Sequence, residues 1–143
     1  APGAVATKAT PTFNATDCAL WVLATNDNAN WEGLAANNGS TAPMTTVETF
    51  NGRTIAPVAA TYEWLMVELI ESDDTDNECA VEFSHFNAAG YLTGRAIGGG
   101  ANAQGPNSNV LLTPWIYVEA RNATSKTLSL DYWNCWQFRV AVQ

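Results

Sequence analysis

Residues 127–143 have the sequence TLSLDYWNCWQFRVAVQ. Apolar and polar side chains alternate along this segment, and successive side chains of a β-strand point to opposite faces of a sheet. One parity holds Leu128, Leu130, Tyr132, Trp136, Phe138, Val140 and Val142, and the other holds Ser129, Asp131, Gln137, Arg139 and Gln143. The pattern predicts a long strand with one buried face, which pairs the end of the chain into a sheet.

Shorter segments of the same kind recur along the chain. We expect strands over Cys18–Thr25, Thr45–Phe50, Arg53–Val58, Tyr62–Glu71, Glu78–Phe86, Tyr91–Ile97, Val110–Arg121 and Thr127–Gln143. Asn51-Gly52 predicts a two-residue hairpin turn, because both residue types tolerate positive φ. Residues 26–43 are expected to form a long loop, with one helical turn near Trp31–Ala36. This rhythm predicts an all-β fold, an antiparallel β-sandwich that is jelly-roll-like and has eight to nine strands.

The segment Tyr62–Glu71 is apolar on both faces at its start, which favours a central strand or a face covered by another chain. Residues 1–12 are mostly Ala, Pro and Thr, so we expect an extended arm or linker there. Residues 13–143 are then expected to form a single domain, which is long enough to bury an ordinary core.

The charge of the chain bears on its partners. The net charge is -8, and the six basic residues are scattered along the sequence. Nucleic-acid binding needs clustered cations to displace counterions from phosphates, so we expect no nucleic-acid partner. We also expect no membrane partner, because anionic lipid attracts cations and the longest uncharged apolar runs are too short to span a bilayer.

The cysteines are Cys18, Cys79 and Cys135. An odd number leaves at least one thiol unpaired in a monomer, and the spacing matches neither C-x-x-C nor a zinc site. Cys18 and Cys79 share their parity with apolar neighbours, which predicts buried, inert thiols. One disulfide plus one free thiol is the alternative.

The last predicted hairpin supplies the candidate binding residues. A turn at residues 122–126 would pair the last two predicted strands. Their less apolar face would then carry Trp115, Tyr117, Glu119, Asp131 and Trp133. Three explanations stay open: a sugar-stacking platform, a subunit contact, or rings covered by the loop at 26–43 or at 98–109.

Asp73, Asp74 and Asp76 lie in an acidic run between two predicted strands. Oxygen ligands at alternate positions suit calcium, which makes these residues a weak candidate for a calcium site. The glycine and the distant glutamate of an EF-hand loop are absent, and a solvated hairpin tip is the explanation that we favour. No other cofactor is expected.

Catalysis is poorly supported by the sequence. His85 is the one histidine, and its parity with Val81 and Phe83 predicts a part-buried strand residue. Adjacent strand residues point to opposite faces, so Ser84 and His85 cannot form a serine–histidine dyad. A glycosidase needs two carboxylates that face one cleft, and the candidates are Glu82, Glu119 and Asp131. We expect a protein that is not an enzyme, with a small glycosidase as the least favoured hypothesis.

Three sequons, at Asn14, Asn38 and Asn122, permit glycosylation and secretion. Asn122 is the best-placed acceptor, because it falls in a predicted turn.

Several features together resemble a viral coat-type β-sandwich, in particular a projecting domain on a virion surface. They are the linker-like start, the many short strands, the Asn-, Gly- and Thr-rich loops and the closing strand pair. The lack of a basic arm departs from shell domains that contact RNA and suits an outward-facing domain. The resemblance implies capsid structure, self-association and attachment to a glycan or host receptor, at a virion surface or outside the cell. The alternative is a secreted, lectin-like carbohydrate-binding module.

Overall fold

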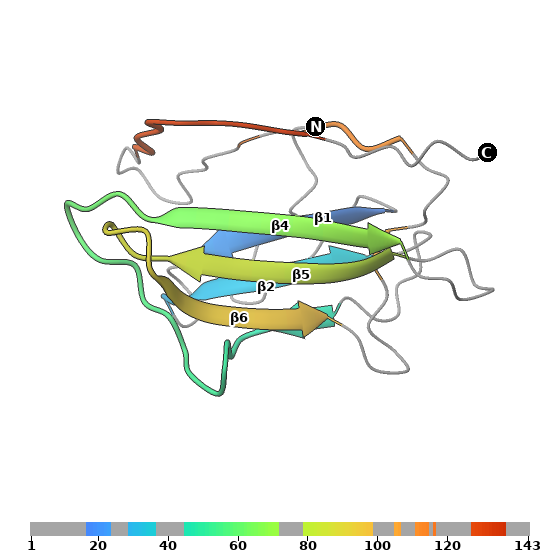
Figure 1. Ribbon diagram of the computed structural model, residues 1–143, viewed down its shortest axis with the longest axis horizontal. Coiled ribbons are helices and arrows are strands. Elements are labelled where there is room, and N and C mark those ends of the chain that lie inside the picture. Colours follow the sequence, from blue (N-terminus) through green and yellow to red (C-terminus); the bar gives the residue numbers. More distant parts are fainter. Residues whose placement is uncertain are drawn as a thin grey trace, which may run out of the picture. The chain divides into compact units, whose positions relative to one another are not determined.

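The computed structural model describes residues 17–23, 29–36, 45–71, 79–98, 105–106, 111–114, 116 and 127–136. Every regular element in these residues is a strand, which confirms the all-β class. The six strands are β1 (Cys18–Leu23), β2 (Trp31–Ala36), β3 (Thr45–Val47), β4 (Trp64–Glu71), β5 (Cys79–Phe86) and β6 (Leu92–Gly98). They form two antiparallel sheets, in the orders β1-β2-β3 and β4-β5-β6 (Figure 1).

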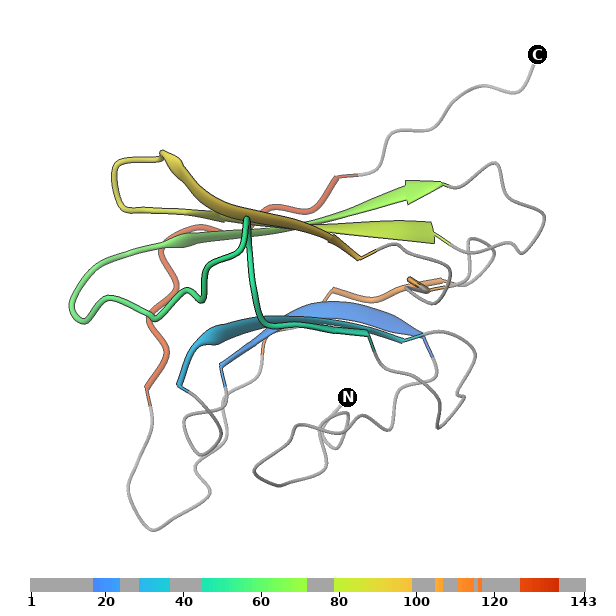
Figure 2. The ribbon, with the colours of Figure 1, turned by 90° about the horizontal axis from the view of Figure 1, so that it is seen from below.

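The two sheets face each other across one apolar core (Figure 2). Its fully enclosed members are Ala35, Phe50, Val81 and Phe83, and Ala19, Trp21, Ile55, Val67 and Ala96 pack against them. The strand residues in this set follow the period of two that a half-buried strand requires. The core therefore forms where the alternating patterns of both sheets meet.

Trp21 of β1 joins the two layers. Its ring stacks on Phe50 with centroids 4.8 Å apart and meets Phe83 of β5 edge-on at 5.5 Å. The indole Nε1–H donates a hydrogen bond of 3.0 Å to the carbonyl oxygen of Met66 in β4. Burial of the ring thus leaves its polar N–H satisfied, as a buried tryptophan requires.

Strand β2 corrects the prediction of a loop with a helical turn near Trp31–Ala36. All six residues of Trp31–Ala36 pair with β1, in a register that sets Trp21 opposite Gly33. Alanine and glycine have little intrinsic preference for strands, so the segment carries no strong local signal. Its structure is set by hydrogen bonding to β1 on one side and β3 on the other.

The turn at Asn51-Gly52 is confirmed. Asn51 has φ 53° and Gly52 has φ 75°, and the backbones of Phe50 and Arg53 exchange hydrogen bonds of 2.7 and 3.1 Å. The strands predicted on either side are shorter than expected. Of the two predicted strands, only β3 and the single bridge between Phe50 and Arg53 are present. Residues 54–58 do not form a strand.

In the sheet that the structure describes, β5 is the central strand and β4 lies at an edge. Within the described residues no strand pairs with the other side of β4, so a central position for Tyr62–Glu71, or a face covered by another chain, stays a prediction. Trp64 and Ile70, which lie on the outward side of β4, are 52% and 43% exposed.

The chain divides into two compact units, Ala1–Leu112 and Thr113–Gln143, and all six strands belong to the first. In the second, residues 127–136 do not form the predicted strand, and the backbone bends at Asp131. Several apolar residues there are exposed rather than buried: Leu128, Leu130, Tyr132 and Trp136. Residues 111–114 and 116 are likewise outside any strand. Residues 137–143 and the predicted arm at 1–12 lie outside the described residues, and a single domain over 13–143 stays a prediction.

Candidate functional site

The predicted aromatic platform falls mostly outside the described residues. Trp115, Tyr117 and Glu119 are not among them, so their pairing with the last segment stays a prediction. Trp133 is 45% exposed and follows the bend at Asp131. Residues 127–136 do not form a strand. The alternation of a strand therefore gives no reason to place Trp133 beside Trp115.

The candidate calcium ligands Asp73, Asp74 and Asp76 also lie outside the described residues. Among the residues that the structure describes, no group of three or more His, Cys, Asp or Glu side chains is placed to hold a metal ion.

All three cysteines are free thiols, with Cys18 buried, Cys79 half-buried and Cys135 exposed. Burial raises the pKa of the Cys18 thiol to about 11. A thiol reacts as the thiolate, so Cys18 is inert at neutral pH, as its apolar parity predicts.

Glu82, a candidate glycosidase acid, lies on the side of β5 that faces away from the core. Its carboxylate is paired with the guanidinium of Arg95 on β6 and accepts a 3.1 Å hydrogen bond from Ser84 Oγ. The hydrogen bond from Arg95 holds the pKa of Glu82 below its usual value. The acid of a glycosidase pair needs a raised pKa, so Glu82 is not suited to that role.

His85 is more deeply buried than the sequence predicts, at 2% exposure. The ladder between β5 and β6 shifts by one residue beside it, so that Thr93 is the extra residue of a β-bulge. A bulge redirects side chains, and here the Thr93 hydroxyl contacts His85 twice. Thr93 Oγ1 forms a short hydrogen bond with His85 Nδ1 and donates to the His85 carbonyl oxygen at 3.2 Å.

Glu63, just before β4, connects this pair to the other sheet. Its Oε2 accepts a 3.1 Å hydrogen bond from Nε1 of Trp31 in β2. Its Oε1 lies 3.4 Å from Nε2 of His85 in β5, close enough for an ion pair but without hydrogen-bond geometry. Trp31, Glu63, His85 and Thr93 thus form one polar chain that runs from β2 to β6.

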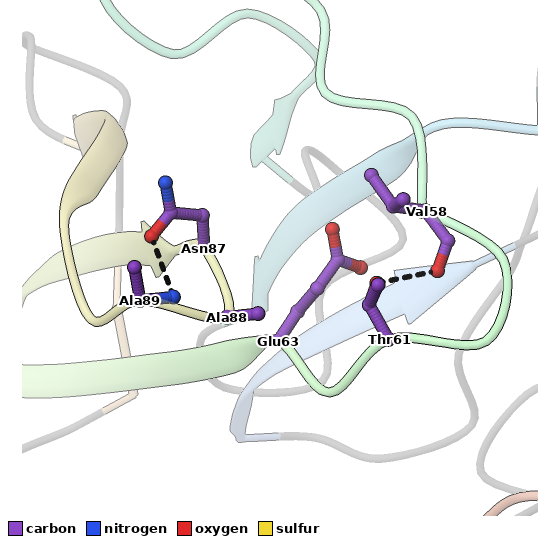
Figure 3. A pocket seen from close by; sticks show the side chains of 6 residues that line it. All are labelled: Val58, Thr61, Glu63, Asn87, Ala88 and Ala89. Atoms are coloured by element: carbon purple, nitrogen blue, oxygen red, sulfur yellow. Dashed lines mark hydrogen bonds between the residues drawn. The ribbon is translucent and has the colours of Figure 1, made fainter.

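A pocket of about 270 Å³ opens beside Glu63 (Figure 3). It is lined by Val58, Thr61, Glu63, Asn87, Ala88 and Ala89. Two short segments form its walls: the loop that leads into β4 and the turn between β5 and β6. Glu63 is the one charged residue in this lining, and its side chain is 9% exposed.

Both walls of the pocket are held by local hydrogen bonds. Asn87 Oδ1 accepts from the backbone N–H groups of Ala89 and Tyr91, both at 3.0 Å, and Gly90 completes the turn with φ 80°. On the other wall, the hydroxyl of Thr61 donates to the carbonyl oxygen of Val58 at 2.8 Å. A carboxylate held between two fixed walls can bind a hydrogen-bond donor or a cation without first being ordered.

Sequence reasoning missed Glu63, although a signal was present. Glu63 shares its parity with Leu65, Val67 and Leu69, so it is the one acidic side chain at the start of an otherwise apolar row. Its contact with Trp31 and His85 could not be predicted, because those residues lie 32 and 22 positions away and the pairing of β1 with β2 was not foreseen.

Within the described residues, no helix has the length and apolar character that crossing a membrane would require. The chain matches no protein-family model, and no curated protein and no solved structure is significantly similar to it.

Proposed function

We propose that this protein is a non-enzymatic surface domain that self-associates and attaches to a host ligand, as a capsid or projecting domain at a virion surface does. The observation that carries the proposal is the outward side of the sheet β4-β5-β6, called the outer face below. Four large apolar residues on it are exposed by 43 to 55%: Trp64, Ile70, Leu92 and Ile97. Four half-exposed apolar side chains on one face of a sheet favour a contact with another protein.

These four residues surround the centre of the outer face. Register places Trp64 and Leu92 on either side of Phe86 at one end and Ile70 opposite Ala80 at the other, with Ile97 opposite Glu82 one row further in. The charged residues Glu68, Glu82 and Arg95 lie between the two ends. The apolar residues therefore form a frame around a small charged centre.

The charged centre suits contact between two copies of the chain. A net charge of -8 opposes association unless the contact surface is close to neutral. Arg95 neutralises Glu82, and the side chain of Arg95 is still 48% exposed. In a two-fold contact the same surface meets itself, so Arg95 of each copy can reach the Glu68 of the other.

The finer architecture that we propose is a jelly-roll-like β-sandwich of eight to nine strands. The six described strands and their two facing sheets support it. The additional strands would come from segments outside the described residues.

The test is the molar mass in solution, measured by light scattering over a range of protein concentrations. We expect a defined dimer or larger assembly for the unaltered chain. Ile97→Glu places a charge in the frame and should dissociate it. Leu111→Glu adds the same charge at a fully exposed residue outside the sheets and should leave the mass unchanged. A monomer at every concentration would contradict self-association.

A secreted carbohydrate-binding module is the second candidate, and the exposed indole of Trp133 is the observation that favours it. A flat exposed ring can stack on the C–H face of a sugar. A glycan screen would then find a ligand that quenches tryptophan fluorescence, and Trp133→Ala would abolish the quenching.

A further inference from the structure

The polar groups in the wall of the pocket beside Glu63 are arranged to accept hydrogen bonds. The carboxyl group of Glu63 has about four acceptor positions, of which Trp31 and His85 approach two. The hydroxyl proton of Thr61 is already donated to Val58, so the Thr61 oxygen is left as an acceptor. In Figure 3 the amide nitrogen of Asn87 points away from Glu63.

The rest of the lining is aliphatic. Val58, Ala88 and Ala89 supply methyl groups on both sides of the carboxylate (Figure 3). A ligand that matches this pocket has hydrogen-bond donors and a positive charge at one end, and a short methylene chain behind them. Sugars match less well, because their hydroxyl groups also need donors from the protein.

We propose that this pocket binds a primary alkylammonium group, and that its physiological occupant is a lysine side chain of a partner protein. An ammonium group has three donors and no acceptor, which complements the carboxyl oxygens of Glu63 and the hydroxyl oxygen of Thr61. The methylenes of lysine can lie along Val58, Ala88 and Ala89 while the charge reaches Glu63. The strongly acidic chain attracts a basic partner at longer range.

The carboxylate is prepared for this role by residues behind it. Trp31 holds Glu63 by a hydrogen bond from β2, so little conformational freedom is lost when a ligand binds. The 3.4 Å separation from His85 Nε2 lacks hydrogen-bond geometry, so His85 does not saturate the carboxylate. This proposal does not depend on self-association through the outer face.

The experiment titrates the isotope-labelled full chain with N-acetyl-lysine methylamide and follows the backbone amide signals of Glu63, Ala88 and Ala89 by NMR. N-acetyl-norleucine methylamide has the same chain without the ammonium group, and methyl glucoside presents hydroxyl groups instead. We expect saturable shifts with the lysine compound and none with the other two. Equal binding of the norleucine compound, binding of the glucoside instead, or no binding at all would each overturn the proposal.

Two variants test the site itself. Glu63→Gln removes the charge with little change of shape and should weaken lysine binding about tenfold or more. Glu48→Gln removes an exposed carboxylate outside the pocket and is the matched control. Ala88→Phe keeps Glu63 and fills the pocket from an exposed turn residue, so it tests the site even if Glu63→Gln disturbs the fold. Unchanged binding in Ala88→Phe would refute the location.

Discussion

The backbone of Gly33 in β2 lies against the ring of Phe83 in β5, on the facing sheet. A Cβ atom at Gly33 would come 2.7 Å from that ring, closer than side-chain atoms approach one another. Gly33 therefore sets how closely the two sheets meet at the centre of the core.

Gly33→Ala should destabilise the protein by about 1–3 kcal/mol, because the added methyl group overpacks the core. Chemical denaturation followed by tryptophan fluorescence measures this free energy. In the double variant with Phe83→Leu, the smaller side chain leaves room for the methyl group, so the two losses should be less than additive. Additive losses would show that the two residues do not meet.

The turn at Asn51-Gly52 gives a second prediction about stability. Gly52 has φ 75°, a conformation that β-branched residues adopt at a cost, and no atom lies within 4 Å of a Cβ built there. Gly52→Val should thus cost about 1–2 kcal/mol through backbone strain alone. Asn51→Gly is the control and should change the free energy of unfolding little, since glycine also accepts positive φ.

Cys18 should make the protein less stable at alkaline pH. Its folded pKa is about 11 against 9.0 for an ordinary thiol, so the contribution is complete below pH 9 and is lost as the pH rises towards 11. We expect a loss of about 1–2 kcal/mol, allowing for partial solvent screening. The difference in free energy of unfolding between the unaltered chain and Cys18→Ala, measured from pH 8 to 11, isolates this contribution. A constant difference would show that Cys18 ionises equally in both states.

Thiol labelling offers an independent check on the same burial. At pH 8 a thiol reagent should modify exposed Cys135 rapidly and Cys18 only as fast as the protein opens. Mass spectrometry of digested samples gives the two rates, and comparable rates would mean that β1 does not cover Cys18.

Glu82 should make the protein less stable at acid pH, whereas Cys18 does so at alkaline pH. Its pKa is held below the usual 4.5 by the hydrogen bond from Arg95, so its contribution is present above pH 4.5 and is lost as acid protonates the carboxylate. Glu82→Gln should flatten the loss of stability below pH 4.5, measured by thermal melting. Glu48→Gln should leave that loss as it is. If the stability of Glu82→Gln falls below pH 4.5 as steeply as that of the unaltered chain, the pair with Arg95 does not form.

The sequence by itself determined the all-β class, β1, β4, β5 and β6 to within two residues at each end, and the turn at Asn51-Gly52. These features depend on neighbours in the chain: the alternation of apolar side chains along a strand and the tolerance of Asn and Gly for positive φ. The parity of Cys79 with Val81 and Phe83 also indicated which face of β5 enters the core, whereas in β1 the core side is that of Ala19 and Trp21 and not that of Cys18.

The tertiary structure alone decided which segments pair and which side chains meet. Trp31–Ala36 is a strand because β1 and β3 hydrogen-bond to it, whereas residues 127–136 have the alternating pattern and still do not form one. A pattern shows which face could be buried, but a strand exists where a partner satisfies its backbone groups. For the same reason Glu63, His85 and Thr93 became one site only when β5, its bulge with β6 and the loop before β4 were in place.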